Sequence, residues 1–173
     1  MPILRRSSGG GTVLLGPGCL IYSLVLRFDR HPALNDLHGS YRHIFDTILA
    51  GLRPHVCGLA LQGSSDLTLD DRKFSGNSQQ RKRTHLLHHG TLLYAFDVAA
   101  IPRYLKAPPR QPEYRRLRDH AEFVTNLPID VEMLRGRMRA AWHADEALGT
   151  RPAESVRQLV AEKYERDEWI RRR

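Results

Sequence analysis

Long apolar runs are missing from this 173-residue sequence. A membrane-spanning helix needs roughly 18–20 apolar residues in succession, and the most apolar stretch, residues 20–26, is interrupted by Tyr22 and Ser23. The N-terminus also lacks the apolar core of a secretory signal peptide, because Arg5 and Arg6 lead directly into glycines. We therefore expect a soluble cytoplasmic protein with no membrane association.

Cysteine is nearly absent from the chain. Cys19 and Cys57 are the only two, and neither lies in the CxxC spacing that is typical of metal sites. The pair provides no disulfide framework and no metal site. The simplest interpretation is that both are small buried thiols.

Aromatic residues are few, at 8% of the chain, and they are not interleaved with the basic clusters. A formal net charge of +8 and a pI near 10.0 raise the question of nucleic acid, but no recognition motif accompanies them. We therefore expect no nucleic-acid partner. The scattered positive charge suits a phosphate-bearing ligand or an acidic protein partner.

The order of apolar patterns predicts an α+β fold with a mixed, largely antiparallel sheet flanked by helices. The length and the 41% hydrophobic content suit one globular core. Asn35 is the expected N-cap of a helix over residues 35–52, whose apolar residues recur at three- and four-residue spacing. The other patterns predict strands over 12–15, 20–28, 56–61, 67–69, 73–78, 84–89 and 91–96, and helices over 98–105, 129–142 and 153–170.

A basic, glycine-rich loop with the sequence RRSSGGGT occupies residues 5–12. Successive glycines let the backbone approach a ligand closely, and exposed amides in such a loop bind anions. The neighbouring arginines add two-pronged donors for phosphate or carboxylate. The spacing matches neither a P-loop nor a dinucleotide-binding fingerprint. The residues alone leave two interpretations open, a phosphate or nucleotide site and an unstructured N-terminal tail.

Two further segments combine polar residues with a strand pattern. Lys73 lies in DRKFSGNS, residues 71–78, where small residues such as Gly76 leave room for a ligand beside the strand. A strand lysine is otherwise usually a solvated surface residue. His88 and His89 are adjacent, and successive strand residues point to opposite faces, so this pair does not suit a single metal ion. One histidine would pack in the core and the other could line a pocket.

Together these three segments resemble the lipoate/octanoate–protein ligase family, whose catalytic domain is of the biotin/lipoate ligase type. RRSSGGGTV resembles the RRxxGGGxV loop of the family, DRKFSGNS its DRKxSGxA segment, and HHGTLLYAFD its HHGTLL segment. The resemblance covers roughly residues 4–100, and QPEYRRLRDHAEFVTNLP, residues 111–128, is similar to the closing helix and loop of the family. It implies a class II synthetase-like fold.

The resemblance also implies a reaction. ATP, with or without Mg²⁺, would activate lipoate or octanoate to an acyl-adenylate, and the acyl group would pass to a lysine of a small acidic lipoyl-carrier domain. Lys73 would be the catalytic residue, holding the acyl carbonyl and the phosphate oxygen. No metal ligand is implied. The implied binding residues for the nucleotide and the medium-chain acid are Arg6, Ser8, Gly9, Gly10, Gly11, Thr12, Val13, Lys73, Gly76 and His89.

The resemblance predicts a domain organisation as well. Residues 1–128 would form the catalytic domain, and residues 129–173 would form a helical extension packed on it. Family members usually carry a His-Asp pair shortly after the glycine loop, where this chain has Gly16-Pro17-Gly18. A first segment of the family domain is also expected before the arginine pair, so the chain corresponds to the later part of that domain.

Two alternative functions stay open. In one branch of the family a cysteine thiolate accepts the octanoyl group from a carrier protein, without ATP. Cys57 is the candidate for that role, because it lies sixteen positions before Lys73 and two after His55, a possible base on the same strand face. The other alternative is a non-catalytic remnant that recognises a carrier domain or a nucleotide.

Overall fold

A computed structural model describes residues 1–109 and 111–172 of the chain. Its centre is a five-stranded antiparallel sheet in the order β1-β5-β4-β3-β2. The predicted α+β class is confirmed. The strands are β1 (Cys19–Arg27), β2 (Leu59–Gln62), β3 (Asp66–Leu69), β4 (Arg72–Arg81) and β5 (His85–Leu93).

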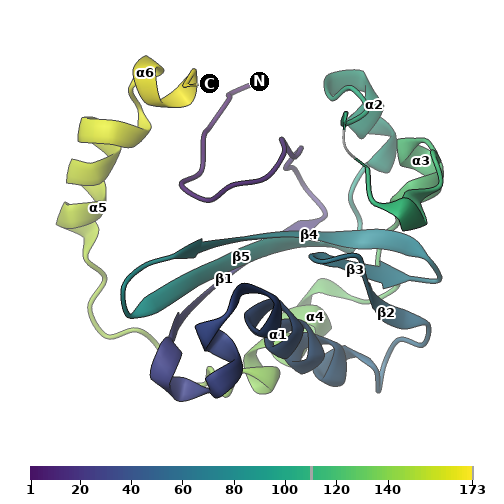
Figure 1. Cartoon of the computed structure of the whole chain (residues 1–173), viewed down its shortest axis with the longest axis horizontal. Coiled ribbons are helices and arrows are strands. Elements are labelled where there is room, and N and C mark those ends of the chain that lie inside the picture. Colours follow the sequence, from purple (N-terminus) through teal and green to yellow (C-terminus); the bar gives the residue numbers. More distant parts are fainter. Residues whose placement is uncertain (110, 173) are drawn as a thin grey trace.

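Helices lie on both sides of the sheet. In Figure 1, α1 (Leu37–Leu52) and α4 (Val131–Ala141) lie below it, and the shorter α2, α3, α5 and α6 lie above its two ends. Among the described residues, no helix combines the length and the apolar character needed to cross a membrane. The shorter elements are η1 (Phe28–Arg30), η2 (Pro32–Asn35), η3 (Val98–Ala100), α2 (Ile101–Tyr104), η4 (Glu113–Arg115), α3 (His120–Phe123), α5 (Ala153–Leu159), the π-helical turn η5 (Val160–Tyr164) and α6 (Asp167–Ile170).

The main core fills the space between the lower face of the sheet and the helices α1 and α4. From Ile44 to Leu52 the apolar α1 positions at three- and four-residue spacing are almost completely buried there, as the sequence pattern predicts, whereas Leu37 at the start of the helix is 47% exposed. The α4 residues Leu134 and Met138 complete the same core. The proposed division of the chain at residue 128 stays a prediction. The largest fully buried side chains of the core are Phe45, Phe74, Leu34, Ile44, Ile48, Leu49, Leu52, Leu67, Leu86, Leu92, Leu127 and Leu134.

The N-cap of α1 lies one residue later than predicted. Asp36 is the N-cap, because its carboxylate accepts the N–H of Gly39 at 2.7 Å. Asn35 belongs to the preceding 3₁₀ turn, where its side-chain amide donates to the Pro32 carbonyl. The prediction of Asn35 as the cap was therefore wrong.

Two strand predictions fail. Residues 12–15 form no strand, because the chain joins the sheet only after the Gly16-Pro17-Gly18 turn, whose Gly18 carbonyl accepts the N–H groups of Tyr94 and Ala95. Residues 84–89 and 91–96 were expected as separate strands, but β5 runs through Gly90 without a break. At Gly90 a side chain would collide with the Asn77 amide, so the glycine serves close packing and not a turn.

Two further elements are shorter than expected. The strand predicted over 56–61 begins only at Leu59, because Gly58 has a positive φ of 76° and the preceding residues form turns. The helix predicted over 153–170 is interrupted. It consists of α5, the π-helical turn η5 and then α6, whose start follows an extended residue at Arg166.

The upper face of β1 is largely uncovered. The side chains of Ile21 and Val25 both lie on this face and are 58% and 69% exposed. At the far end of β5, a second, smaller core cluster containing Leu93, Phe96 and Phe123 packs on the upper face. The open part of the upper face is therefore bounded at one end by α2 and α3.

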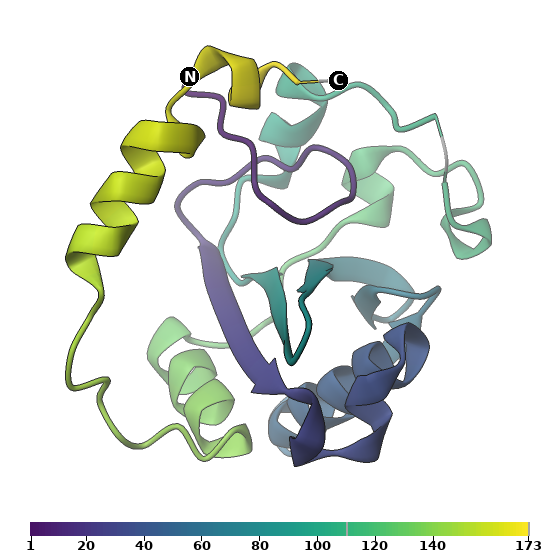
Figure 2. The same cartoon turned by 60° about the vertical axis from the view of Figure 1, so that its left-hand side comes forward.

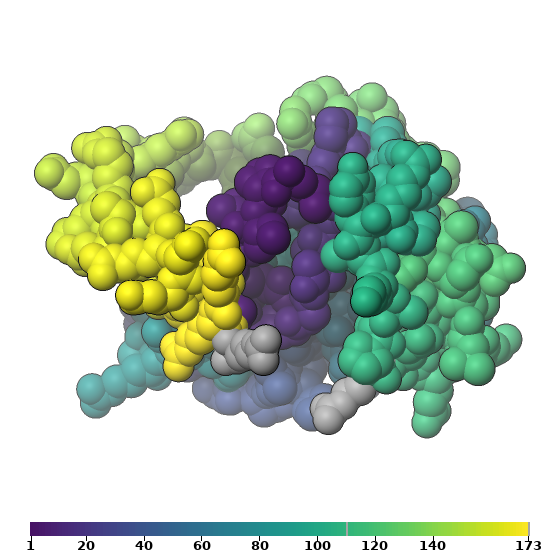
Figure 3. All heavy atoms as spheres, turned by 90° about the horizontal axis from the view of Figure 1, so that it is seen from above, coloured from purple at the N-terminus to yellow at the C-terminus, as the bar shows by residue number. Residues whose placement is uncertain are grey.

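The two ends of the chain meet above the sheet. Figure 2 shows the N-terminal segment passing beside α6, and from above it lies between the C-terminal helices and the segment around α2 (Figure 3). The indole N–H of Trp169 donates to the Arg5 carbonyl at 2.9 Å, and the Arg5 guanidinium donates to the Ile170 carbonyl at 3.2 Å. These bonds tie α6 to the beginning of the glycine-rich loop.

Candidate functional site

Polar side chains from three strands gather on the upper face of the sheet. The β3–β4–β5 register places Asp66 opposite Gly76 and Gly76 opposite Thr91. One step along, Ser78 lies opposite His89. Since residues two apart on a strand share a face, these side chains form one continuous group. The sequence-predicted residues Gly76 and His89 both belong to it.

Lys73 reaches this group because of an irregularity in β4. The β3–β4 register shifts between Leu67 and Thr68, which gives Lys73 a place on the same face as Gly76. Its side chain extends over that glycine, where an added Cβ would lie 3.9 Å from the Lys73 Nζ atom. The Nζ atom lies 2.6 Å from Oδ1 of Asp66, and the lysine side chain keeps 29% exposure. Lys73 is therefore a partly accessible cation with a fixed carboxylate partner.

The glycine-rich loop of residues 5–11 lies against the same face. The Ser8 hydroxyl is 2.5 Å from Nε2 of His89, and the Ser78 hydroxyl donates to the Gly9 carbonyl at 2.8 Å. The structure thus brings the loop, the β4 lysine segment and the β5 histidine together, although they are far apart in the sequence.

Arg6 organises the interior of the loop. Its Nη2 atom donates to the Gly9 carbonyl at 2.7 Å and to the Gly11 carbonyl at 2.9 Å. Partial burial lowers the pKa of the Arg6 guanidinium. Gly10 has a φ of 97°, and a Cβ there would lie 2.8 Å from Arg6 Nη2, so this position requires glycine.

Thr12 and Val13 stand apart from the rest of the predicted site. Both are exposed, Val13 at 50%. Within residues 1–109 and 111–172, no side-chain hydrogen bond joins either residue to Lys73, Gly76 or His89. Their assignment as binding residues stays a prediction.

The adjacent histidines point to opposite faces, as the strand pattern predicts. His88 is completely buried below the sheet, where its ring nitrogens lie 3.0 Å from the Tyr22 hydroxyl and 3.2 Å from the Gln79 amide. Burial lowers the pKa of His88 to about 3. Burial and the Arg6 charge also lower the pKa of His89. Both imidazoles are therefore neutral at pH 7, and His89 is the one that faces the site.

The cysteines depart from the prediction. Cys57 is exposed, not buried, because it lies in the turn region before β2. His55 lies in the same turn region and not on a strand, so the expected shared strand face is wrong. Cys19 is half-buried on β1, and its thiol lies near the Thr91 side chain. The cysteine beside the polar group is thus Cys19.

We expect the two thiols to differ in their reaction with iodoacetamide. Burial raises the pKa of the Cys19 thiol, which reduces the reactive thiolate, and the side chain is partly shielded. Cys57 should be alkylated roughly tenfold faster at pH 7.5, measured by mass spectrometry of the two tryptic peptides. A Cys57→Ser variant isolates the slow reaction. Equal rates at both cysteines would contradict the placement of Cys19.

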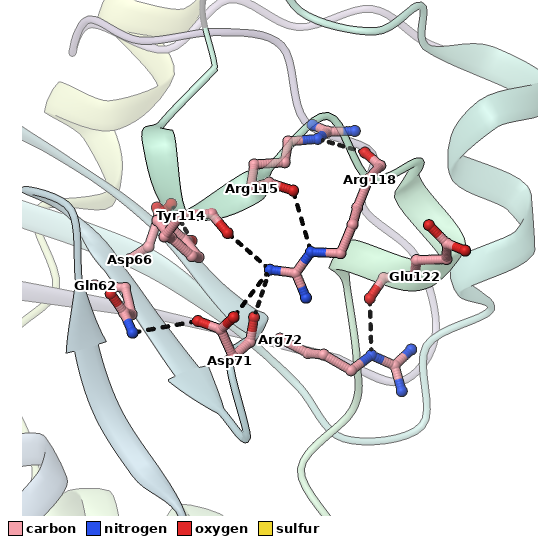
Figure 4. Close-up of polar contacts among 8 residues, drawn as sticks. All are labelled: Gln62, Asp66, Asp71, Arg72, Tyr114, Arg115, Arg118 and Glu122. Carbon is pink, nitrogen blue, oxygen red and sulfur yellow. Dashed lines mark hydrogen bonds and ion pairs between the residues drawn. The ribbon is translucent and has the colours of Figure 1, made fainter.

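Sequence reasoning missed a polar network behind Lys73. The Tyr114 hydroxyl donates to Oδ2 of Asp66 at 2.7 Å, and Arg118 Nη2 donates to the carbonyls of Asp71 and Tyr114 (Figure 4). Arg72 donates to three carbonyls at the end of α3. The only signal for these contacts was the polar segment 113–118 itself, since no periodicity links it to β3.

The arrangement suits a phosphate-bearing or carboxylate ligand. Lys73 and Arg6 supply positive charge, and Ser8 and Ser78 supply hydroxyls. Over the described residues, no three His, Cys, Asp or Glu side chains are grouped so as to hold a metal ion. A groove of about 370 Å³ lies elsewhere, between β1 and α4, and its lining includes Leu20, Tyr22 and Met138. None of the residues of the polar group is among those that line this groove.

Comparison with known proteins gives one family match. The sequence model of the lipoyl protein ligase A/B catalytic domain matches residues 1–138. The chain is 23% identical to lipoate-protein ligase LplJ of Bacillus subtilis, over 96% of this chain and 53% of the relative. It is 32% identical to a putative lipoate-protein ligase A of Schizosaccharomyces pombe, over 61% of this chain and 28% of the relative. The chain thus spans about half the length of the first relative, and less of the second.

Solved structures show the same fold. A bi-partite lipoate protein ligase from Thermoplasma acidophilum, described with its E2 lipoyl domain, has a TM-score of 0.79 at 22% identity, covering 97% of this chain and 69% of that one. A lipoate-protein ligase A bound with ATP has a TM-score of 0.76 at 21% identity, covering 96% of this chain and 70% of that one. The predicted ligase-like fold is confirmed.

Proposed function

This chain belongs to the lipoyl protein ligase A/B catalytic domain family, and from that premise we propose that it forms an acyl-adenylate from ATP and lipoate or octanoate. The acyl group then passes to a lysine of a lipoyl-carrier domain. The observation that carries this proposal is the convergence of Lys73, Gly76 and the Arg6 loop on one open sheet face. A cytoplasmic location belongs to the same proposal.

The residues fit an acyl-adenylate in charge and shape. Arg6 and residues 8–13 would hold the nucleotide end, and Lys73 lies over Gly76, where a ligand can reach the strand closely. His89 is uncharged and borders the loop. The exposed apolar side chains of Ile21 and Val25 share the sheet face and offer a surface for the acyl chain. One solved relative is described with bound ATP and another with bound lipoic acid, which supports both ligands.

The chemistry needs charge stabilisation more than a protein nucleophile. In the first step a carboxylate oxygen of the acid attacks the α-phosphorus of ATP and pyrophosphate leaves. In the second step the carrier lysine amine attacks the acyl carbonyl and AMP leaves. Lys73 is the residue that can stabilise negative charge on the phosphate and carbonyl oxygens in both steps. Any bound Mg²⁺ would add to the charge neutralisation of the phosphates.

An acidic lipoyl-carrier domain is the partner in this proposal. The formal net charge of +8 favours rapid encounter with an acidic protein. The archaeal structure described with its E2 lipoyl domain supports the same class of partner.

The proposal is tested by intact-mass spectrometry of a lipoyl-carrier domain after incubation with this protein. Octanoate or lipoate is supplied as the free acid, with ATP present or omitted, and an octanoyl-carrier thioester is supplied in a separate incubation without ATP. We expect one acyl adduct that requires ATP. An adduct formed only from an octanoyl-carrier thioester would support the cysteine-dependent transferase. No adduct from a folded protein would support a non-catalytic binding module.

Gly10→Ala is expected to weaken ATP binding by about tenfold. The new Cβ requires an unfavourable positive φ and displaces the Arg6 guanidinium from the loop, which costs about 1–3 kcal/mol. The rise in melting temperature on ATP addition reports the affinity, because a ligand that binds only the folded state stabilises it. Gly149→Ala is the control, since a Cβ at that position meets no neighbour within 4 Å and the residue lies outside the loop. Equal ATP-induced shifts in the two variants would refute this role for the loop.

A further inference from the structure

Asp66 is an almost buried carboxylate whose two oxygens have different partners. It begins β3 and is 8% exposed. Oδ1 lies 2.6 Å from the Lys73 ammonium, and Oδ2 accepts the Tyr114 hydroxyl at 2.7 Å. A carboxylate removed from water needs such partners. The plane of the Asp66 carboxylate, and therefore the place where Lys73 is held, depends on both bonds.

Tyr114 is itself fixed by the turn that contains it. Arg116 and Leu117 both have positive φ values, 50° and 61°, which fold the chain tightly after η4. Arg118 returns along this turn and donates to the Tyr114 carbonyl at 2.9 Å and to the Asp71 carbonyl at 3.0 Å (Figure 4). The turn is thus bonded to the β3–β4 hairpin, and it presents the Tyr114 hydroxyl to β3.

The chemistry of Tyr114 suits a hydrogen-bond donor. Burial and the Asp66 carboxylate raise the pKa of Tyr114 well above its ordinary value, so the hydroxyl stays protonated. The ring has its own contact, a tilted stack on Phe123 with centroids 5.2 Å apart. Arg118 bonds the Tyr114 backbone and not its side-chain oxygen. The hydroxyl is therefore separable from the packing, and its described partner is Asp66.

We propose that Tyr114 is a positioning residue for Lys73 and acts through Asp66. In the free protein it fixes the carboxylate that holds the ammonium over Gly76. When an anionic ligand takes the Lys73 ammonium from Asp66, the Tyr114 hydroxyl keeps one carboxylate oxygen bonded, which lowers the cost of that transfer. The expected effect of Tyr114 on catalysis rests on the proposed function, and the placement of Lys73 by Tyr114 does not.

Competitive acetylation tests the placement of Lys73 without any activity. The chain has four lysines, and the exposed Lys82 and Lys106 serve as internal references. The protein is treated with limiting acetic anhydride, and peptide mass spectrometry gives the modification of Lys73 relative to the references. Tyr114→Phe should raise this ratio roughly threefold or more, the size of effect typical for contacting pairs. Asp66→Asn should raise it further.

Tyr104→Phe provides the matched control. Tyr104 is 59% exposed, so loss of its hydroxyl should leave both the Lys73 ratio and catalysis unchanged. In the acyl-transfer assay, Tyr114→Phe should lower kcat about tenfold and change the KM for ATP by less, because the hydroxyl matters most when charge develops. A role in folding alone would instead lower the melting temperature and leave kcat per folded molecule intact.

The outcomes separate this inference from the proposed function. An unchanged Lys73 ratio in folded Tyr114→Phe would overturn the inference, and so would an unchanged kcat in an active enzyme. The same change of ratio in Tyr104→Phe would also overturn it. If the wild-type chain transfers no acyl group, the proposed function fails, and the acetylation ratio still decides whether Tyr114 positions Lys73.

Discussion

Lys73→Ala is expected to reduce ATP-dependent acylation of a lipoyl-carrier domain by about 10²–10³-fold. Lys73 is the cation that extends over Gly76 at the centre of the polar group, and alanine removes all of its charge. The intact mass of the carrier domain, followed with time, gives the rate. The substitution should act mainly on kcat, because the charge it removes counts most on oxygens that become more negative during reaction.

The control for this variant is Lys82→Ala, which removes an exposed lysine beyond the end of β4. Its acylation rate should stay close to that of the wild type. Lys73→Ala must also be shown to be folded, because it leaves the Asp66 carboxylate with Tyr114 as its described side-chain partner. A folded Lys73→Ala variant that acylates the carrier at the wild-type rate would remove Lys73 from the reaction.

Gly18→Ala is expected to lower the free energy of unfolding by about 2–4 kcal/mol. Gly18 has a φ of 81°, and a Cβ would lie 2.1 Å from the backbone carbonyl of Ala95. The new Cβ would collide with backbone atoms, and the collision cannot be relieved by rotating a side chain. The Gly18 carbonyl also accepts the N–H groups of Tyr94 and Ala95, and any backbone shift strains these bonds. A stability of the usual ~5–15 kcal/mol would be reduced substantially.

Urea denaturation of Gly18→Ala and Gly149→Ala makes the comparison direct. A Cβ at Gly149 meets no neighbour within 4 Å, and its φ is not in the positive range. The Gly149 variant should therefore unfold at nearly the wild-type urea concentration. If the Gly18 variant did the same, the tight junction between the start of β1 and the end of β5 would be wrong.

The elements that the sequence predicted well are those with a strong internal period. The α1 pattern holds because one face of that helix supplies much of the main core, so burial and spacing agree. The β1 pattern holds for the same reason, with Tyr22 buried below the sheet and Ile21 exposed above it. Failures occur where a tertiary contact decides. At Gly90, where two separate strands were expected, β5 continues and the Asn77 amide packs against the glycine.

The sequence motifs named several residues that the structure brings together, but they did not indicate the contacts between them. The three motifs identified Lys73, Gly76 and His89 before any fold was known, and strand alternation placed His88 on the opposite face from His89. The bond from Tyr114 to Asp66 spans 48 positions, and Arg72 reaches 50 positions to the Glu122 carbonyl. Such contacts depend on how the 113–127 segment returns to the β3–β4 hairpin, and no local pattern contains that information.

The bond between Trp169 and Arg5 gives this protein an optical property. The chain has two tryptophans, and one of them donates its indole N–H to the backbone carbonyl that immediately precedes Arg6. Trp142 lies at the end of α4, with a buried indole nitrogen that has no hydrogen-bond partner among the described residues. The two indole N–H groups therefore differ in hydrogen bonding. Emission from Trp169 should change whenever the glycine-rich loop moves, so the chain carries its own reporter of that loop without an added label.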